Sequence, residues 1–331
     1  MTDAVFEIKG LSRRFIPMAT LARPWTFSVL LFVVLLICNL IVLPAFLAAS
    51  NLAATLAVGA PWVLAAMAAT PSILSGGGGI DISIGPLIGF VNVFIIGVLV
   101  AHGLANPAIV IPVVIAIGIF VGAVNGILVA YIRVQPIVAT LGMYLLLVGL
   151  ALVVLPQPGG TAPTWLIHLA GSFGPVPGSL LLIVPAIGMW IAIRKLPFHR
   201  ALLGTGSDDR AAFTAGVNTE LVRVCAYALG GFFAALAGIA LTALVQSGDP
   251  TLGAPFTLVA ISAAVLGGTS VAGGVGGMAG SIVAALDIYL IQELLSAAHV
   301  PSSWIQVMYG AILLISLAIN SAIRTFGRKT R

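Results

Sequence analysis

The chain has 331 residues, of which 60% are hydrophobic and only 7% carry a charge. An ordinary soluble domain is about 25% charged. The 14 basic and 9 acidic side chains are too few to cover a folded protein of this size in water. Intrinsic disorder is excluded as well, because disordered chains are poor in apolar residues. The composition therefore predicts a membrane protein that crosses the bilayer many times.

Long stretches of the chain carry no charge. Asp81 is the only ionised residue between Arg23 and Arg133, and none lies between Arg133 and Arg194. Because one helical crossing takes about 20 residues, stretches of this length must cross the membrane several times. The apolar runs are continuous and lack the alternation of a transmembrane strand. We therefore predict an all-α fold.

Clusters of proline, glycine and charged residues divide the chain into ten predicted transmembrane helices. Broken glycine-rich elements interrupt them, and the eighth span is short and ends in glycines. A tail of residues 1–24 precedes the transmembrane domain of residues 25–322, and a basic tail of residues 323–331 follows it. The predicted spans lie near residues 25–46, 52–74, 83–101, 107–131, 137–155, 179–194, 223–246, 257–270, 279–298 and 304–322.

The basic residues set the predicted orientation. With the amino terminus inside, every lysine and arginine falls in a cytoplasmic segment, as the positive-inside rule requires. Both termini are therefore predicted to be cytoplasmic, and the first span is expected to remain as an anchor, since residues 1–24 are too charged for a signal peptide. The net charge of +5 reflects this orientation. Nucleic-acid binding is not expected, because no basic cluster is interleaved with aromatic residues.

Asp81 follows a run of four glycines that starts at Gly76. A carboxylate at the membrane centre costs about 2.5–3.5 kcal/mol, and four glycines cannot hold a regular helix in lipid. We interpret this segment as a broken helix beside a transport pathway, in which Asp81 and Ser83 cap the following helix. The alternative is a short cytoplasmic turn with a solvated aspartate.

A polar stripe marks the ninth span. Tyr289, Gln292, Glu293 and Ser296 share one helical face. Such a stripe either lines a wet cavity or forms hydrogen bonds between helices. Asp287 lies about 160° around the helix from Tyr289, so it either pairs with another helix or is protonated.

Thr140 and Tyr144, one helical turn apart, form a second candidate lining, although both residue types are tolerated in lipid-buried helices. Asn125 is a further polar residue and lies beside a double GxxxG pattern. That spacing allows a neighbouring backbone to approach closely. The pattern consists of Gly118, Gly122 and Gly126, and Gly230, Ala234 and Gly238 are interpreted in the same way.

No catalytic constellation is present in the sequence. The four histidines are scattered over loops and helix ends, and there is no HExxH, GxSxG or Walker motif. Neither an enzyme nor a metal site is predicted. Active transport by this chain would therefore need an energy source from outside it.

Four segments resemble, in order, the motifs of the ribose-type (monosaccharide) permease family, the membrane subunits of bacterial ABC importers that depend on a binding protein. The first, GGIDISIG, is similar to the family signature GGIDLSVG, and the last is similar to AVVIGGTSLFGG. The segments are residues 78–85, residues 121–141 (VGAVNGILVAYIRVQPIVATL), the Ala211, Ala212 and Gly216 pattern, and residues 263–274 (AAVLGGTSVAGG).

The resemblance implies a permease subunit that moves a monosaccharide or a related small neutral polyol across the bacterial inner membrane. It implies a second permease subunit, two ATPase subunits that bind ATP and Mg, and a periplasmic sugar-binding protein. No cofactor is expected in this subunit, and no nucleic acid as a partner. The alternative is a secondary transporter coupled to protons, with Asp81, Asp287 or Glu293 as the relay.

The resemblance also implies a role for the cytoplasmic loop of residues 195–222, which would carry the helix that docks on the ATPase. The expected coupling residues are Ser207, Asp208, Asp209, Arg210, Ala211, Ala212 and Gly216. The expected pathway residues are Asp81, Ser83, Asn125, Thr140, Tyr144, Tyr289, Gln292 and Glu293.

The chain departs from the family pattern at several places. Asp287 replaces an apolar residue, and the coupling loop has Gly206, Ser207 and Asp208 where GGN is common. Residues 257–260 read TLVA where the family has ELDA, and Gln292 and Glu293 replace two asparagines. Substrate identity is therefore not carried over from the resemblance.

Overall fold

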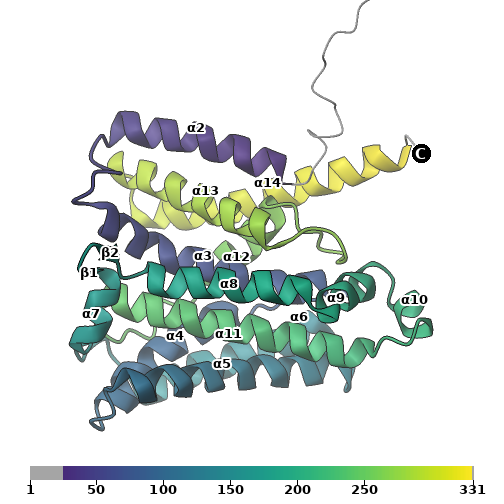
Figure 1. Cartoon of the computed structure of the whole chain (residues 1–331), viewed down its shortest axis with the longest axis horizontal. Helices are drawn as coiled ribbons and strands as arrows, with labels where there is room; N and C mark the ends of the chain where they lie inside the picture. The colour runs from purple at the N-terminus through teal and green to yellow at the C-terminus, as the bar shows by residue number, and fades with distance from the viewer. Residues whose placement is uncertain (1–24, 330–331) are drawn as a thin grey trace, which may run out of the picture.

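The computed structural model describes residues 25–329, and the predicted tail of residues 1–24 lies outside them. The described chain is mostly helical (Figure 1). The elements are α2 (Thr26–Val42), α3 (Leu52–Leu74), α4 (Ile84–Phe94), the π-helix η1 (Ile95–Val100), α5 (Pro107–Ala130), α6 (Pro136–Val154), α7 (Thr164–Ala170), β1 (Ser172–Phe173), β2 (Val176–Pro177), α8 (Leu180–Lys195), α9 (Pro197–Ser207), α10 (Asp209–Thr214), α11 (Thr219–Val245), α12 (Pro255–Leu266), α13 (Met278–Ala297) and α14 (Ser302–Lys329).

Each of the ten predicted segments contains a helix, with differences at the ends. α11 begins at Thr219 rather than near 223, because the Asn218 side chain accepts a hydrogen bond from the backbone N–H of Leu221 at 2.9 Å and caps the helix earlier. α14 continues to Lys329, so the tail predicted from residue 323 is helical up to that point. No proline interrupts that helix.

Five helices, α3, α5, α6, α11 and α13, are long and apolar enough to cross a membrane. α8 and α9 together form a sixth candidate, bent by 78° at the break between them. α2, α4 with η1, α12 and part of α14 are shorter apolar helices. The chain is thus a multi-pass integral membrane protein, and the count of ten crossings stays a prediction.

The long helices run side by side, and the connections gather at two ends of the bundle (Figure 1). The start of α2, the short α10 and the end of α14 lie at one end. At the other end are α7 and the hairpin in which Ser172 pairs with Pro177 and Phe173 with Val176. This short hairpin, in the segment of residues 156–178, leaves the described chain mostly helical, as the all-α prediction expects.

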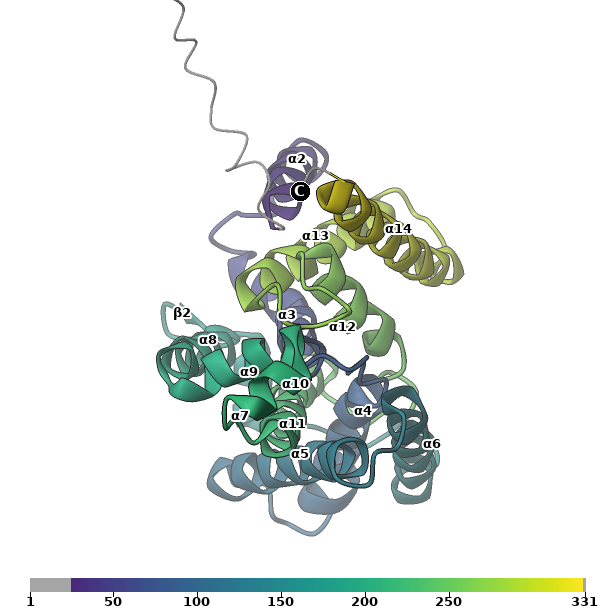
Figure 2. The same ribbon diagram turned by 90° about the vertical axis from the view of Figure 1, so that its right-hand side faces the viewer.

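α3 and α11 form the centre of the bundle, and α5 packs along α11 (Figure 2). The glycines of the predicted GxxxG pattern face α11. A Cβ atom at Gly122 would clash with the carbonyl oxygen of Tyr227, and one at Gly118 with that of Gly231. The predicted close approach of two backbones is therefore confirmed. In lipid such packing replaces the hydrophobic effect as the force between helices.

Replacing Gly122 with alanine is expected to destabilise the protein by about 1–3 kcal/mol, because the neighbouring atoms belong to the α11 backbone and cannot turn aside. Thermal unfolding of the purified protein in detergent measures the effect. Gly149→Ala on α6 is the control, since no atom lies within 4 Å of its Cβ position. Equal melting temperatures for the two variants would contradict the packing interpretation.

Candidate functional site

The connection between α3 and α4 is an unwound stretch of backbone, defined here as the glycine loop (residues 75–83). Gly76, Gly77 and Gly78 have φ angles of 75°, 63° and 74°. Residues with a Cβ atom rarely adopt such angles. The run of glycines thus permits the turn, and the predicted break in the helix is confirmed.

Asp81 lies inside the protein with 4% of its surface exposed. Its Oδ1 atom accepts hydrogen bonds from the backbone N–H of Ser83 at 2.9 Å and from Ser83 Oγ at 2.6 Å. Asn125 Nδ2 on α5 donates to Ser83 Oγ at 2.8 Å. The structure therefore joins three predicted pathway residues in one buried chain of hydrogen bonds, and the alternative of a solvated turn is wrong.

The predicted capping of α4 needs a correction. Ser83 is the residue before the helix, but its side chain makes no capping hydrogen bond. Its hydroxyl instead donates backwards to Asp81. Asp81 binds the N–H of Ser83, which precedes the helix, so neither side chain satisfies an amide in the first turn of α4.

Two threonines hold the carbonyl groups of the glycine loop. Thr140 Oγ1 lies 3.4 Å from the carbonyl oxygen of Ile80, and also donates to its own helix at Pro136 O. Thr257 Oγ1 on α12 donates to Ile82 O at 3.1 Å. Tyr144 lies one turn along α6 and is partly exposed. The loop is thus held from α5, α6 and α12 at once.

The backbone where α3 meets the glycine loop packs closely against Gly206 of α9 and against the glycine turn at residues 273–274. A Cβ atom at Gly206 would clash with Leu74 O and with the backbone of Gly274. The N–H of Gly274 donates to Leu74 O at 3.1 Å. The last of the four predicted motifs, residues 263–274, therefore contacts the end of α3 next to the first motif.

The predicted coupling segment is divided into two helices. Ser207 ends α9, which is packed into the bundle, whereas α10 contains residues 209–214. Asp208 separates them, and its Oδ1 atom caps α10 by accepting from Ala211 N at 3.0 Å. Asp209, Arg210 and Ala211 are exposed, as is the turn at Gly216. Ala212 is buried, so it anchors α10 instead of facing outward.

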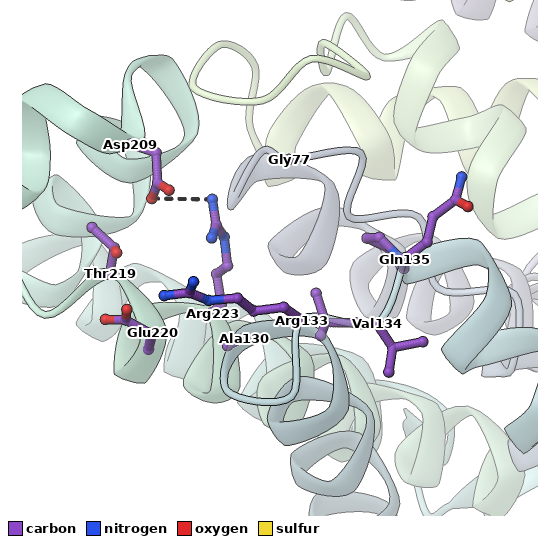
Figure 3. Close-up of a pocket in the computed structure, with 11 residues that line it drawn as sticks. Gly77, Ala130, Arg133, Val134, Gln135, Asp209, Thr219, Glu220 and Arg223 are labelled. Atoms are coloured by element: carbon purple, nitrogen blue, oxygen red, sulfur yellow. Dashed lines mark ion pairs between the residues drawn. The ribbon is translucent and has the colours of Figure 1, made fainter.

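A cavity of about 330 Å³ lies between α10, the start of α11 and the α5–α6 turn (Figure 3). Arg223 on α11 points into it and forms an ion pair with Asp209, with Nη2 and Oδ1 3.0 Å apart. Arg133 extends from the α5–α6 turn toward Glu220. Gly77 of the glycine loop forms part of the same wall. The cavity therefore adjoins both the exposed helix α10 and the unwound stretch.

Two polar atoms near this region have no hydrogen-bond partner among the described residues. They are Asn125 Oδ1 and Tyr227 Oη, and both side chains are fully buried. Tyr227 lies on the α11 face that packs on Gly122 and Gly126. Unpaired buried polar atoms are generally rare, and these two lie together at the α5–α11 interface.

The polar stripe of α13 lies elsewhere, at the end of the bundle opposite α10 (Figure 1). Tyr289 Oη donates to Thr55 O at 3.1 Å, and Tyr309 Oη donates to Gln292 Oε1 at 2.5 Å. Glu293 lines a cavity of about 420 Å³ together with Asn51 and Thr55. Ser296 is exposed. The stripe thus makes contacts of both predicted kinds. It is separate from the residues around Asp81, which we call the Asp81 group (Asp81, Ser83, Asn125 and Thr140).

Asp287 is fully buried on α13. Neither of its carboxylate oxygens has a hydrogen-bond partner among the described residues. The predicted pairing with another helix is therefore not found in this part of the chain. Nor do residues 25–329 contain a group of three or more histidine, cysteine, aspartate or glutamate side chains that could hold a metal ion.

The sequence did not identify Arg223, Tyr227 and Thr257 as site residues. Arg223 carried little signal, because it is the fifth residue of α11 and lies beyond the first turn, where the helix dipole acts. Thr257 stands where the resembled family has a carboxylate. Tyr227 carried no signal, since a tyrosine in an apolar helix is common.

Replacing Ser83 with alanine is expected to destabilise the protein by about 1–3 kcal/mol, because it removes the link between Asp81 and Asn125 and leaves buried polar groups unpaired. Thermal unfolding in detergent tests this. Ser296→Ala, an exposed serine on α13, should stay within about 0.5 kcal/mol of the wild type. If Ser83→Ala unfolds at the wild-type temperature, the buried hydrogen bonds do not stabilise the loop.

The chain was compared with known proteins. Residues 51–317 match the family model described as "Branched-chain amino acid transport system / permease component". No solved structure matches.

Three relatives are similar over most of the chain. The ribose import permease protein RbsC of Escherichia coli K12 is 33% identical over 254 residues, covering 73% of this chain and 77% of that protein. RbsC of Bacillus subtilis strain 168 is 32% identical over 248 residues, covering 73% and 76%. The autoinducer 2 import system permease protein LsrC of E. coli K12/DH10B is 32% identical over 272 residues, covering 79% and 76%. The chain therefore belongs to the family of branched-chain amino acid transport system permease components.

Proposed function

We propose that this chain is the permease subunit of an ATP-binding cassette importer that moves a monosaccharide or a related small neutral polyol across the bacterial inner membrane. The observation that carries this proposal is the match to permeases of ribose and autoinducer 2 import over about three quarters of the chain. The permease family and the apolar helices support a subunit embedded in the membrane.

The proposed cargo is neutral because the chain offers few charges to an ionic substrate. The cavity at the α2–α3 end presents Asn51, Thr55 and Tyr289, with Glu293 as its single carboxylate. Amide and hydroxyl groups both donate to and accept from sugar hydroxyls, and a carboxylate accepts from them. We propose that this stripe, with Gln292, forms the outer part of the pathway.

The Asp81 group has a different proposed role. Asp81, Ser83, Asn125 and Thr140 are buried and hydrogen-bonded to one another or to the glycine loop. In this conformation they line none of the cavities described above. We propose that they brace the unwound backbone beside the pathway, with Tyr144 next to them on the partly exposed side of α6.

ATP and Mg are proposed to bind to separate ATPase subunits, and no cofactor to this one. α10 supports this assignment because it lies at the same end of the bundle as the start of α2 and the end of α14, the end that we propose to be cytoplasmic. Its first residues are exposed and can be reached by a partner. The proposed docking residues are Ser207, Asp208, Arg210 and Ala211, with Gly216 in the turn that follows. Of the other expected coupling residues, Ala212 is buried and Asp209 pairs with Arg223. A second permease subunit completes the pathway, and a periplasmic sugar-binding protein docks at the end that carries α7 and the hairpin.

Uptake by the reconstituted permease and its ATPase is expected to require ATP and the binding protein, and to be insensitive to an ionophore that collapses the proton gradient. Radiolabelled sugar uptake into proteoliposomes measures both. The alternative, a carrier coupled to protons through Asp81, Asp287 or Glu293, predicts uptake without the ATPase. Uptake driven by a proton gradient alone would overturn the importer proposal.

Arg210→Glu is expected to weaken co-purification of the ATPase by about ten-fold or more. Arg210 is exposed on α10, and in the proposed complex its charge would lose water against the ATPase, so reversing the charge would oppose docking. Affinity purification from membranes measures the ratio of the two subunits. Lys195→Glu, the same charge reversal at the end of α8, is the control. An unchanged subunit ratio for Arg210→Glu would count against α10 as the docking element.

A further inference from the structure

Arg223 contacts two parts of the chain that the proposed function assigns to different tasks. Its Nη2 atom forms the ion pair with Asp209, the first residue of α10. The same Nη2 atom lies 3.3 Å from the position that a Cβ atom at Gly77 would occupy. Figure 3 shows the guanidinium group between Asp209 and the glycine loop. One side chain thus spans from the exposed helix to the unwound backbone.

The position of Arg223 is not explained by helix stability. It is the fifth residue of α11, beyond the first turn in which the helix dipole acts on a charge. Its side chain is 17% exposed, so part of its hydration has been lost. Asp209 is 47% exposed, and partly exposed ion pairs contribute little to stability. Because the ion pair between Arg223 and Asp209 contributes little to stability, it can break and reform during a transport cycle.

The glycine loop is suited to receive a displacement from this contact. Gly77 has a φ angle of 63° and no side chain, and the guanidinium group occupies the space beside its Cβ position, with Nη2 3.3 Å away. Four residues later the loop reaches Asp81, whose hydrogen bonds connect it to Ser83 and to Asn125 on α5. A shift of α10 would therefore reach the buried Asp81 group through Arg223 and Gly77.

We infer that Arg223 is a positioning residue that transmits movement of the ATPase-docking helix α10 to the glycine loop through its simultaneous contacts with Asp209 and Gly77. We call this set of contacts the Arg223 link. The inference rests on the proposed function, because it needs an ATPase that moves α10. Beyond the docking site, the inference specifies the route by which the movement of α10 reaches the membrane domain.

The test is a double-mutant cycle in the complete reconstituted importer, with permease, ATPase and binding protein. Asp209→Asn and Arg223→Gln are made singly and together, and sugar uptake and ATP hydrolysis are measured in the same proteoliposomes. In each single variant, the amount of sugar imported per ATP hydrolysed should fall by about 5-fold or more. The ATPase should remain bound and active. The double variant should fall no further than the worse single variant, because both changes break the same link.

Glu220→Gln is the matched control, since Glu220 is a carboxylate in the same cavity and forms no ion pair with the residues that the structure describes. It should stay within about two-fold of the wild type. If Arg223→Gln fails to reach the membrane, Arg223→Lys replaces it in the cycle. Lysine keeps the charge but lacks the planar fork that contacts Asp209 and the loop together, so the same fall in sugar imported per ATP is expected.

The outcomes separate the two proposals. Unchanged sugar import per ATP in both single variants would overturn the Arg223 link alone, as would effects that multiply in the double variant. Loss of the ATPase from Asp209→Asn but not from Arg223→Gln would also overturn it, because Asp209 would then act in docking. If the wild-type assembly shows no uptake driven by ATP, the proposed function fails, and the link with it.

Discussion

The structure depends on one constraint, which is that a stretch of unwound backbone inside a membrane protein must find its hydrogen-bond partners within the protein. The glycine loop is that stretch. Its N–H and C=O groups bond within the loop, to Thr140 and to Thr257. The carbonyl group of Leu74, just before the loop, accepts from Gly274 N. The elements around the loop are arranged so that their polar groups reach it.

This constraint explains why glycine occurs at several distant positions. The turn itself uses glycines with positive φ angles, whereas Gly206 lies where another backbone passes too close for a Cβ atom. The α5–α11 contact follows the same steric rule at Gly118 and Gly122. Backbone contact without intervening side chains leaves little freedom between the elements. A displacement of one element is then passed to the next instead of being absorbed by side-chain rotation.

Function in this family has to connect an energy source at one end with a pathway through the membrane. The two ends of the helix bundle differ in chemistry accordingly. At the α10 end, the charges of Arg133, Asp209 and Arg223 surround a cavity next to the glycine loop. At the opposite end, the cavity beside Glu293 is lined mainly by apolar, amide and hydroxyl groups. The Arg223 link joins the first of these to the Asp81 group, and the α13 stripe stays separate from both.

Much of the fold could be predicted because the membrane imposes simple rules on sequence. Apolar segments of helical length, separated by proline, glycine and charge, located every long helix, and GxxxG spacing identified the face of α5 that approaches another backbone. The ends were less predictable, since the start of α11 depends on the Asn218 cap and the division of the coupling segment depends on Asp208. Single side chains decide these ends, and hydropathy does not register them.

The sequence by itself determined that the chain is helical, that it lies in a membrane and that Asp81 requires shielding, because charge is costly in lipid wherever the helices happen to pack. Only the tertiary structure decided which residues meet. It placed Ser83 and Asn125 against Asp81, left the α13 stripe at the other end, and put Arg223 between Asp209 and Gly77. Contacts between residues far apart in the chain follow from helix packing, which periodicity along one helix does not encode.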